Sequence, residues 1–304
     1  NPGWGYRDVL PFFRKSEDHD FGESDYHWRG GPQHVTDIVG KAHPLCDLFI
    51  ESSKALGFRY TTDFNGAESE GVGIYQINTR KGLRASTANE YLRPSLRRPN
   101  LTLRARAHAT RLLFKERRAV GVEYLQRGQA HQARAAREVL LSAGSYNSPQ
   151  ILMLSGIGPA DHLKTHGIAP IHDLPGVGQN LSEHPNFLSV YALREHAGMT
   201  RHLRLDRATG GVVRWFLRHD GAFACNGAAA NIFLRTIPGL ERPDVQLTPM
   251  PVHNGARLWF PGLTPPPFFC YSIRIGVMHP RSRGWVRLSS ADPRAKPRIQ
   301  FNMY

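Results

Sequence analysis

The stretch EVLLSAGSYNSPQILMLSGIG, residues 138–158, constrains the fold of this chain more than any other. An apolar run ends in the small residues of SAGS, and the amphipathic segment that follows is closed by Gly156 and Gly158. This order predicts a buried strand, a tight turn and a short helix. The loop of such a βα unit lies at the carboxyl edge of the sheet, where open α/β folds bind ligands. The stretch therefore raises the question of a nucleotide cofactor.

The rest of the sequence predicts a mixed fold, α/β in its middle and α+β overall. The second half holds short apolar pieces between proline-rich loops, which is the pattern of an antiparallel sheet, and a domain boundary is expected near residues 176–186. Helical patterns occur at residues 4–18, 35–58 and 86–94, and strand patterns at residues 71–79, 100–114 (two strands with a crossing), 118–128 and 136–143.

Length and charge restrict the class of protein. With 304 residues the chain can form two domains, or one large domain with a second lobe. The net charge is +14, but the arginines form neither a block nor a stripe at helical period, so no nucleic-acid partner is predicted. No apolar run approaches the ~20 residues that span a bilayer, and no secretory signal is recognisable. The chain begins with Asn1 rather than methionine, so we expect it to be a piece of a longer protein.

A search for catalytic motifs finds little. There is no GxGxxG, P-loop, HExxH or GxSxG pattern, and GVGQNL at residues 176–181 lacks both the third glycine and a preceding strand. The HxxC spacing of His43 and Cys46 has no second ligand pair, so we predict an ordinary half-buried cysteine and no metal site. His184 is the histidine most worth following, although hydrogen bonding within its proline-bounded turn is the favoured role.

The opening stretch nevertheless resembles a known family. Ten residues fit the second signature of the glucose-methanol-choline (GMC) oxidoreductases: Gly144, Ser145, Ser148, Pro149, Ile151, Leu152, Ser155, Gly156, Ile157 and Gly158. Further stretches, among them YHWRGGP, EGVGIYQINTRKGLRASTANEYLRP, GVGQNLSEHP and PRSRGWVRLSSADPRAKPRIQFNMY, occur in the family's order. The chain thus resembles the central fragment of a bacterial member similar to choline and alcohol dehydrogenases.

The resemblance implies FAD as the cofactor. It implies that Ala143 and Gly144 let the backbone approach the ribose and pyrophosphate, and that the backbone of Ala109 contacts the adenine, where valine is more usual. It also places Pro149 near the first turn of the helix, where its missing N–H costs nothing. Close packing of strand on helix is the alternative explanation for the three small residues.

The resemblance further implies a domain organisation. Its segments are a lid or linker region of the FAD domain at residues 1–30, a substrate-domain segment at 31–94, an FAD-domain segment at 95–180, and the substrate domain at 181–304. The family's GxGxxG unit is expected before Asn1, and its active-site histidine, with a second histidine or asparagine, beyond Tyr304. No catalytic residue is therefore assigned within this chain, and we expect the 304 residues alone to be inactive.

The implied activity is FAD-dependent oxidation of a choline-like or other primary alcohol to the aldehyde, by hydride transfer to the flavin. A dehydrogenase is favoured over an oxidase, with quinone and oxygen both open as electron acceptors. The expected location is the cytoplasm, with association with a membrane left open. Six aromatic residues are candidates for the substrate wall, with ordinary core positions as the alternative: Trp215, Phe216, Trp259, Phe260, Phe268 and Phe269. A basic binding module without catalysis and a flavin-dependent lyase remain as alternative functions.

Overall fold

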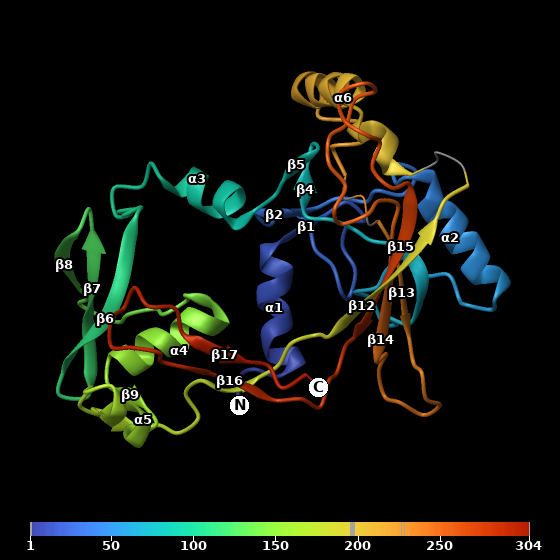
Figure 1. The fold of residues 1–304 in the computed structure, drawn as a ribbon. Coiled ribbons are helices and arrows are strands. Elements are labelled where there is room, and N and C mark those ends of the chain that lie inside the picture. Colours follow the sequence, from blue (N-terminus) through green and yellow to red (C-terminus); the bar gives the residue numbers. More distant parts are fainter. Residues whose placement is uncertain (1, 195–197, 226, 228, 304) are drawn as a thin grey trace. The chain divides into compact units, whose positions relative to one another are not determined.

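The structure is a computed structural model that describes residues 2–194, 198–225, 227 and 229–303. The chain divides into two compact units, whose elements are labelled in Figure 1. Unit 1 comprises Asn1–Leu101 and Asn186–His279, and unit 2 comprises Thr102–Pro185 and Pro280–Tyr304. Together the elements form the mixed α/β fold that the sequence predicts.

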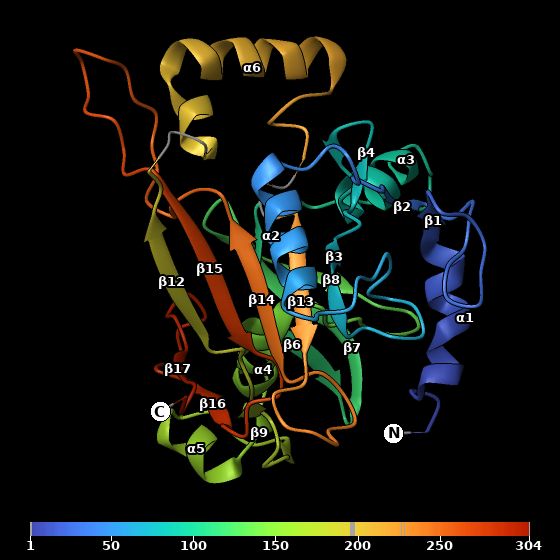
Figure 2. The same cartoon turned by 90° about the vertical axis from the view of Figure 1, so that its right-hand side faces the viewer.

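Unit 1 is built on a five-stranded antiparallel sheet in the order β12-β15-β14-β13-β3, which Figure 2 shows nearly face on. Its strands are β3 (Gly71–Ile74), β12 (Asn186–Ala192), β13 (Ala230–Leu234), β14 (Val245–Met250) and β15 (Cys270–Val277). Because β3 pairs with β13, a segment from the first third of the chain completes a sheet made mainly by the second half. The antiparallel sheet predicted for the second half is confirmed.

Helix α2 (Pro44–Ala55) covers this sheet and supplies its core. Cys46 and Ile50 are buried against Val72 and Ile232 of the sheet. The helical pattern began at residue 35, but the helix starts only at Pro44, because the residue before a proline is driven into the extended region.

The other elements of unit 1 are short or lie on its surface. They are α1 (Tyr6–Ser16), the parallel pair β1 (Glu17–His19) and β2 (Gln33–Val35), the hairpin β4 (Thr79–Arg80) and β5 (Leu83–Arg84), the helical turns η1 (Ala88–Leu92), α3 (Arg93–Ser95) and η2 (Met199–Leu203), and α6 (Leu205–Arg218). Among the described residues, no helix is both long enough and apolar enough to cross a membrane.

Unit 2 contains the segment with which the sequence analysis began. Its sheets are β6-β7-β8 and β11-β16-β17, both antiparallel, and the parallel pair β10-β9. Its elements are β6 (Ala107–Lys115), β7 (Arg118–Gln126), β8 (Gln129–Arg134), α4 (Gly144–Leu154), β9 (Ile157–Gly158), α5 (Ala160–Thr165), β10 (His172–Asp173), β11 (Gln179–Leu181), β16 (Gly284–Arg287) and β17 (Arg298–Gln300). Its core is formed by Met153, Leu163, Val177 and Leu288.

The unit boundaries differ from the sequence-based segments at both ends of the chain. Residues 1–30, expected with the FAD-domain segment, belong to unit 1 together with residues 31–94. Residues 181–304 were expected to form one segment, but residues 280–304 belong to unit 2. The reason is strand pairing, since β16 pairs with β11, and Leu288 is buried in the core beside Met153. Which unit binds the flavin and which the substrate remains a prediction.

Two strand predictions in unit 2 are wrong. Residues 100–114 were expected to hold two strands, but the structure has one there, β6, which begins only at Ala107. The expected buried strand at residues 136–143 is an unpaired, largely exposed segment in which Leu140 is 81% exposed. A strand buried on both faces needs neighbours to pair with and to cover it, and the described residues provide none for this segment.

Candidate functional site

The predicted flavin-binding segment forms the start of α4 in unit 2. Gly144 has φ +86°, and a Cβ atom built on it would meet no atom within 4 Å. Its conformation therefore requires glycine, whereas close packing does not. Half-buried Ala143 precedes it and donates its backbone N–H to Ser148 Oγ at 3.0 Å. Open space beside the positive end of an eleven-residue helix fits an anionic group such as the pyrophosphate of FAD.

The later residues of the signature have structural roles. Ser155 Oγ accepts the backbone N–H of Leu112 at 2.8 Å and donates to the carbonyl of Ile151 at 2.5 Å, so it fastens the end of α4 to β6. Gly156 has φ +82°, and a Cβ there would lie 2.8 Å from the carbonyl oxygen of Ala169. Packing, rather than ligand contact, accounts for this half of the signature.

Pro149 does not lie where the sequence placed it. It was expected near the first turn, but it is inside α4, which begins at Gly144. At this position it removes the hydrogen bond that a backbone N–H would donate to the carbonyl of Ser145. The helix tolerates this loss, and the N-terminal explanation for Pro149 is wrong.

Ala109, the predicted adenine contact, lies in β6 opposite Tyr124 of β7. Within the described residues β6 is an edge strand, because β7 pairs with it on one side alone. The pairing also shifts register between Ala109 and Arg111. Backbone groups along an unpaired edge are available to a ligand, so the position suits a main-chain contact, and the contact itself stays a prediction.

Unit 1 contains two neighbouring cavities, of about 850 and about 970 Å³. The charged residues that line the first are Asp20, Lys41, Lys81, Arg214, Arg218 and Asp220. Arg214 is paired with Asp220 at 2.5 Å, and no carboxylate within ion-pair distance of Lys41, Lys81 or Arg218 is found among the described residues. The first cavity therefore carries an excess of positive charge.

His43 also lines the first cavity, in a role the sequence analysis missed. Its Nδ1 accepts the backbone N–H of Leu45 at 3.2 Å and caps α2, so the neutral ring carries its proton on Nε2. That Nε2 is buried without a partner in the described part of the chain. Burial, with smaller contributions from His202 and Arg201, lowers the pKa of His43 and keeps the ring neutral. Its HxxC partner Cys46 was expected to be half-buried, but it is fully buried, because α2 packs it into the sheet core.

A buried polar network lies within the sheet of unit 1. The side-chain amide of Gln246 donates to the hydroxyl of Tyr75 and, at 3.2 Å, to Asn231 Oδ1, which also accepts from the Thr248 hydroxyl at 2.9 Å. Burial raises the pKa of Tyr75 to about 12, so the phenol stays protonated. Asn231 is fully buried, and Tyr75 lines the second cavity. Polar residues inside the apolar runs ANIFL and DVQLTPM were the signal that could have revealed this network.

The six aromatic candidates do not gather around one cavity. Trp215 lines the second large cavity and donates its indole N–H to the carbonyl of Gly82 at 3.0 Å. Trp259 and Phe269 contact each other edge to face away from this cavity. Phe216 and Phe268 are exposed, so they are neither core residues nor part of a cavity wall. Phe260 lies at the margin of exposure, at 36%.

His184 is exposed at the end of the first segment of unit 2. Its backbone N–H donates to Glu183 Oε1 at 3.0 Å. It does not line the cavities found in the described residues, so it gains no functional role from the structure.

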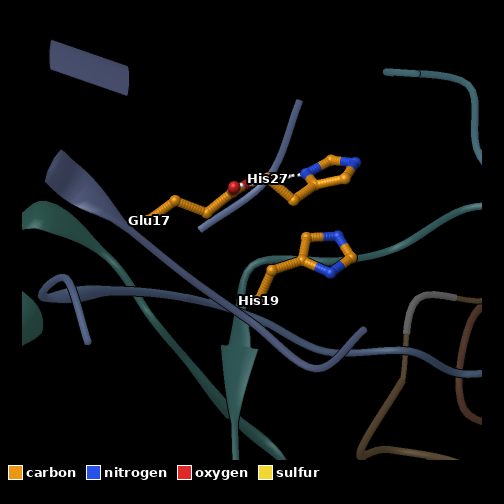
Figure 3. Close-up of side chains that lie close together, drawn as sticks. All are labelled: Glu17, His19 and His27. Atoms are coloured by element: carbon orange, nitrogen blue, oxygen red, sulfur yellow. Dashed lines mark hydrogen bonds and ion pairs between the residues drawn. The ribbon is translucent and has the colours of Figure 1, made fainter. Parts of the chain in front are cut away.

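A cluster of titratable groups that the sequence analysis missed is shown in Figure 3. Glu17 and His19 come from β1, and His27 from the loop before β2. The His27 Nδ1 lies 3.1 Å from Glu17 Oε1, and its Nε2 lies 2.9 Å from Asp63 Oδ2. Burial alone would lower the pKa of His27, but the hydrogen bonds with Asp63 and Glu17 outweigh it, and the pKa is raised.

The protons of this cluster are arranged for an ion pair rather than for a metal ion. With a carboxylate at each nitrogen, the His27 ring is held as an imidazolium and offers no lone pair. The His19 Nδ1 accepts the backbone N–H of Phe21 at 3.1 Å, so its proton sits on Nε2, which is buried and without a partner among the described residues. Burial, followed by the charge of His27, lowers the pKa of His19. Three ligand atoms lie within 4.8 Å of one another, but the donor set does not fit a cation in this state.

Comparison with known proteins agrees with the resemblance. The family model of the GMC oxidoreductases matches residues 1–186. The chain is 39% identical to the oxygen-dependent choline dehydrogenase of Photobacterium profundum over 305 residues, covering 99% of this chain and 52% of the relative. Against the mitochondrial choline dehydrogenase of Homo sapiens the identity is also 39%, with coverages of 99% and 50%. The chain therefore spans about half the length of these curated relatives.

Solved structures give the same picture. The formate oxidase of Aspergillus oryzae, described in connection with FAD modification, superimposes with a TM-score of 0.86 at 26% identity, covering 98% of this chain and 57% of that one. The expectation of FAD as the cofactor is in agreement with this neighbour and with the family match.

Proposed function

The chain belongs to the GMC oxidoreductase family, and from that premise we propose that the whole protein oxidises a choline-like or other primary alcohol to the aldehyde. The observation that carries this proposal is the family match over residues 1–186, which includes the α4 signature. FAD, when bound, supplies the hydride acceptor. The residues of this chain bind and orient the cofactor and the alcohol.

We assign the flavin contacts to unit 2 and the substrate-binding residues to unit 1. The start of α4, with Ala143 and Gly144, would receive the ribose and pyrophosphate, and the backbone of Ala109 the adenine. The open space and left-handed backbone at Gly144 support this assignment.

Anaerobic titration of the FAD-loaded full-length protein with primary alcohols tests the activity. We expect the visible absorbance band of the flavin to bleach as the alcohol is oxidised. A flavoprotein that binds FAD but is not bleached by any alcohol would be a lyase. A protein without flavin affinity that binds polyanions with steep salt dependence would be a basic binding module. Reoxidation by oxygen or by a quinone then identifies the electron acceptor.

Replacing Ala143 with leucine should reduce FAD affinity at least tenfold, because the larger side chain would occupy the approach to the pyrophosphate. Fluorescence titration of the full-length apoprotein with FAD measures the change. Exposed Ala136 in the same unit provides the control, since A136L should bind FAD as the parent does. Equal FAD affinity for A143L and A136L would contradict the assigned contact.

The positive charge around the first cavity of unit 1 favours an uncharged alcohol over choline. Four cationic and two acidic side chains line this cavity, and its described lining residues include no tryptophan, tyrosine or phenylalanine. Because a quaternary ammonium group would meet like charges there, we expect kcat/KM for a neutral primary alcohol to exceed that for choline by at least tenfold. Steady-state kinetics on both substrates measure the ratio. A preference for choline would contradict the proposal that the alcohol binds in the first cavity of unit 1.

A further inference from the structure

We propose that α6 docks unit 1 on an anionic lipid surface. Five apolar side chains of α6 are exposed, an arrangement that soluble proteins rarely keep without a partner. They define the α6 surface: Leu205, Val212, Val213, Phe216 and Leu217.

The sequence of α6 separates an apolar face from a basic face. Leu205, Val212 and Phe216 recur at spacings of seven and four residues, which places them on one side of the helix. Its arginines, Arg207, Arg214 and Arg218, recur at the same spacings and so lie together on another side. An apolar face bordered by arginine is the arrangement of helices that lie in a membrane interface.

The α6 surface is fixed in place without being covered. Ala208 is the buried residue of the helix, and the Trp215 indole N–H holds it to the carbonyl of Gly82 at 3.0 Å. The Trp215 ring packs edge to face against Phe216, with 5.2 Å between the ring centroids, yet Phe216 is still 69% exposed. The helix therefore presents a rigid apolar face, and no large loss of conformational entropy opposes its docking.

The loop between β14 and β15 extends the α6 surface. The backbone N–H of Leu205 donates to the carbonyl of Trp259 at 2.8 Å, which ties this loop to the start of α6. Figure 2 shows the loop and α6 at the same end of the unit. Its apolar side chains are exposed too, namely Leu258, Leu263 and Phe268. Helix and loop can thus enter an interface together.

Charge selects a lipid surface over a second copy of this chain. Residues 201–220 contain five arginines and two aspartates, and the whole chain carries a net charge of +14. The aspartates are bound to Arg204 and Arg214, which leaves Arg201, Arg207 and Arg218 without carboxylates within ion-pair distance among the described residues. The arginines beside the α6 surface of one copy would repel those of a second copy, whereas anionic headgroups attract each basic side chain.

Vesicle cosedimentation of the full-length protein tests the proposal. The probes are vesicles of phosphatidylcholine with phosphatidylglycerol and vesicles of phosphatidylcholine alone, each at low and high salt. We expect binding to the anionic vesicles that weakens with salt. F216S should lower the partition coefficient by about tenfold, and R207Q by about fivefold.

The matched control is F187S. Phe187 is 68% exposed, close to the 69% of Phe216, but it lies near the start of β12, at the other end of the sheet in Figure 2. F187S should bind vesicles as the parent does. Absence of vesicle binding, or equal binding by F216S and F187S, would overturn the proposal.

Two further outcomes would show that α6 is covered by protein rather than by lipid, and either of them would overturn the proposal. A dimer that F216S dissociates in sedimentation velocity, without vesicles, would identify a second copy as the partner. A melting temperature that F216S lowers by several degrees, while F187S leaves it unchanged, would show that another part of the polypeptide packs on α6.

Discussion

Replacing His27 with alanine is expected to lower the free energy of unfolding of unit 1 by about 3–5 kcal/mol. His27 is 5% exposed, and its ring nitrogens bind Glu17 and Asp63. Without the ring, two carboxylates are left close together in a partly buried site with no cation between them. Glu17 would keep the backbone N–H of Trp28, at 2.9 Å, as a donor.

The free energy of unfolding lost when His27 is replaced with alanine should decrease as the pH rises. The pKa of His27 is raised by folding, so its stabilising effect is complete below the unfolded pKa of about 6.5. The effect is lost as the pH rises through the higher folded pKa. The difference in unfolding free energy between parent and H27A should therefore be largest in mildly acid solution and should decrease toward alkaline pH.

Hydrogen exchange of unit 1 peptides at several pH values measures this difference and separates it from the stability of unit 2. Exposed His279, in the same unit, is the control, and H279A should change little at any pH. A pH-independent loss in H27A would show that packing, and not the imidazolium, stabilises the site.

Replacing Gly178 with alanine is expected to destabilise unit 2 by about 3 kcal/mol. Gly178 has φ +77°, and a Cβ there would lie 2.1 Å from the carbonyl oxygen of Val286. The Val286 N–H also donates to the Gly178 carbonyl at 2.7 Å. An added methyl group would therefore strain the backbone and push β16 away from the turn before β11.

Gly176, two residues earlier, is the matched control. A Cβ built there meets no atom within 4 Å, and its φ is not positive. G176A should change the stability by no more than about 0.5 kcal/mol. Urea unfolding, followed by hydrogen exchange in the unit 2 peptides, compares the two variants. Similar losses in both would mean that the contact with Val286 does not decide the requirement for glycine.

The same glycine pair shows why a motif search has limits. GVGQNL resembles a fragment of a nucleotide-binding motif, but the structure explains Gly178 by its approach to Val286, more than a hundred residues later in the chain. Gly144 shows the reverse case. Packing was a sufficient explanation from the sequence, yet its added Cβ would touch nothing.

The candidate site residues were predictable to different degrees. Motif order pointed to the start of α4, because the residues of a turn and a helix are adjacent in sequence. The cluster of Glu17, His27 and Asp63 could not be found in that way, since His27 lies 10 residues from Glu17 and 36 residues from Asp63 in the sequence. The same holds for the Tyr75–Gln246 contact, which spans 171 residues.

The sequence by itself determined the family, the mixed fold class and the local elements whose signals are short in range. Helix α2 and strand β7 follow from periodicity and from stop signals such as Gly57, and the α4 signature from its run of small and apolar residues. These features depend on neighbours in the chain, so local propensity is sufficient to reveal them.

The tertiary structure alone decided which distant segments join and which strands find partners. It moved residues 280–304 into unit 2, because β16 pairs with β11. It left the apolar segment around Leu140 unpaired, because a strand exists only where another backbone satisfies its hydrogen bonds. It also exposed the apolar side of α6, although the same amphipathic pattern usually predicts burial. Pairing and burial are properties of two surfaces, and the sequence of one segment specifies only one of them.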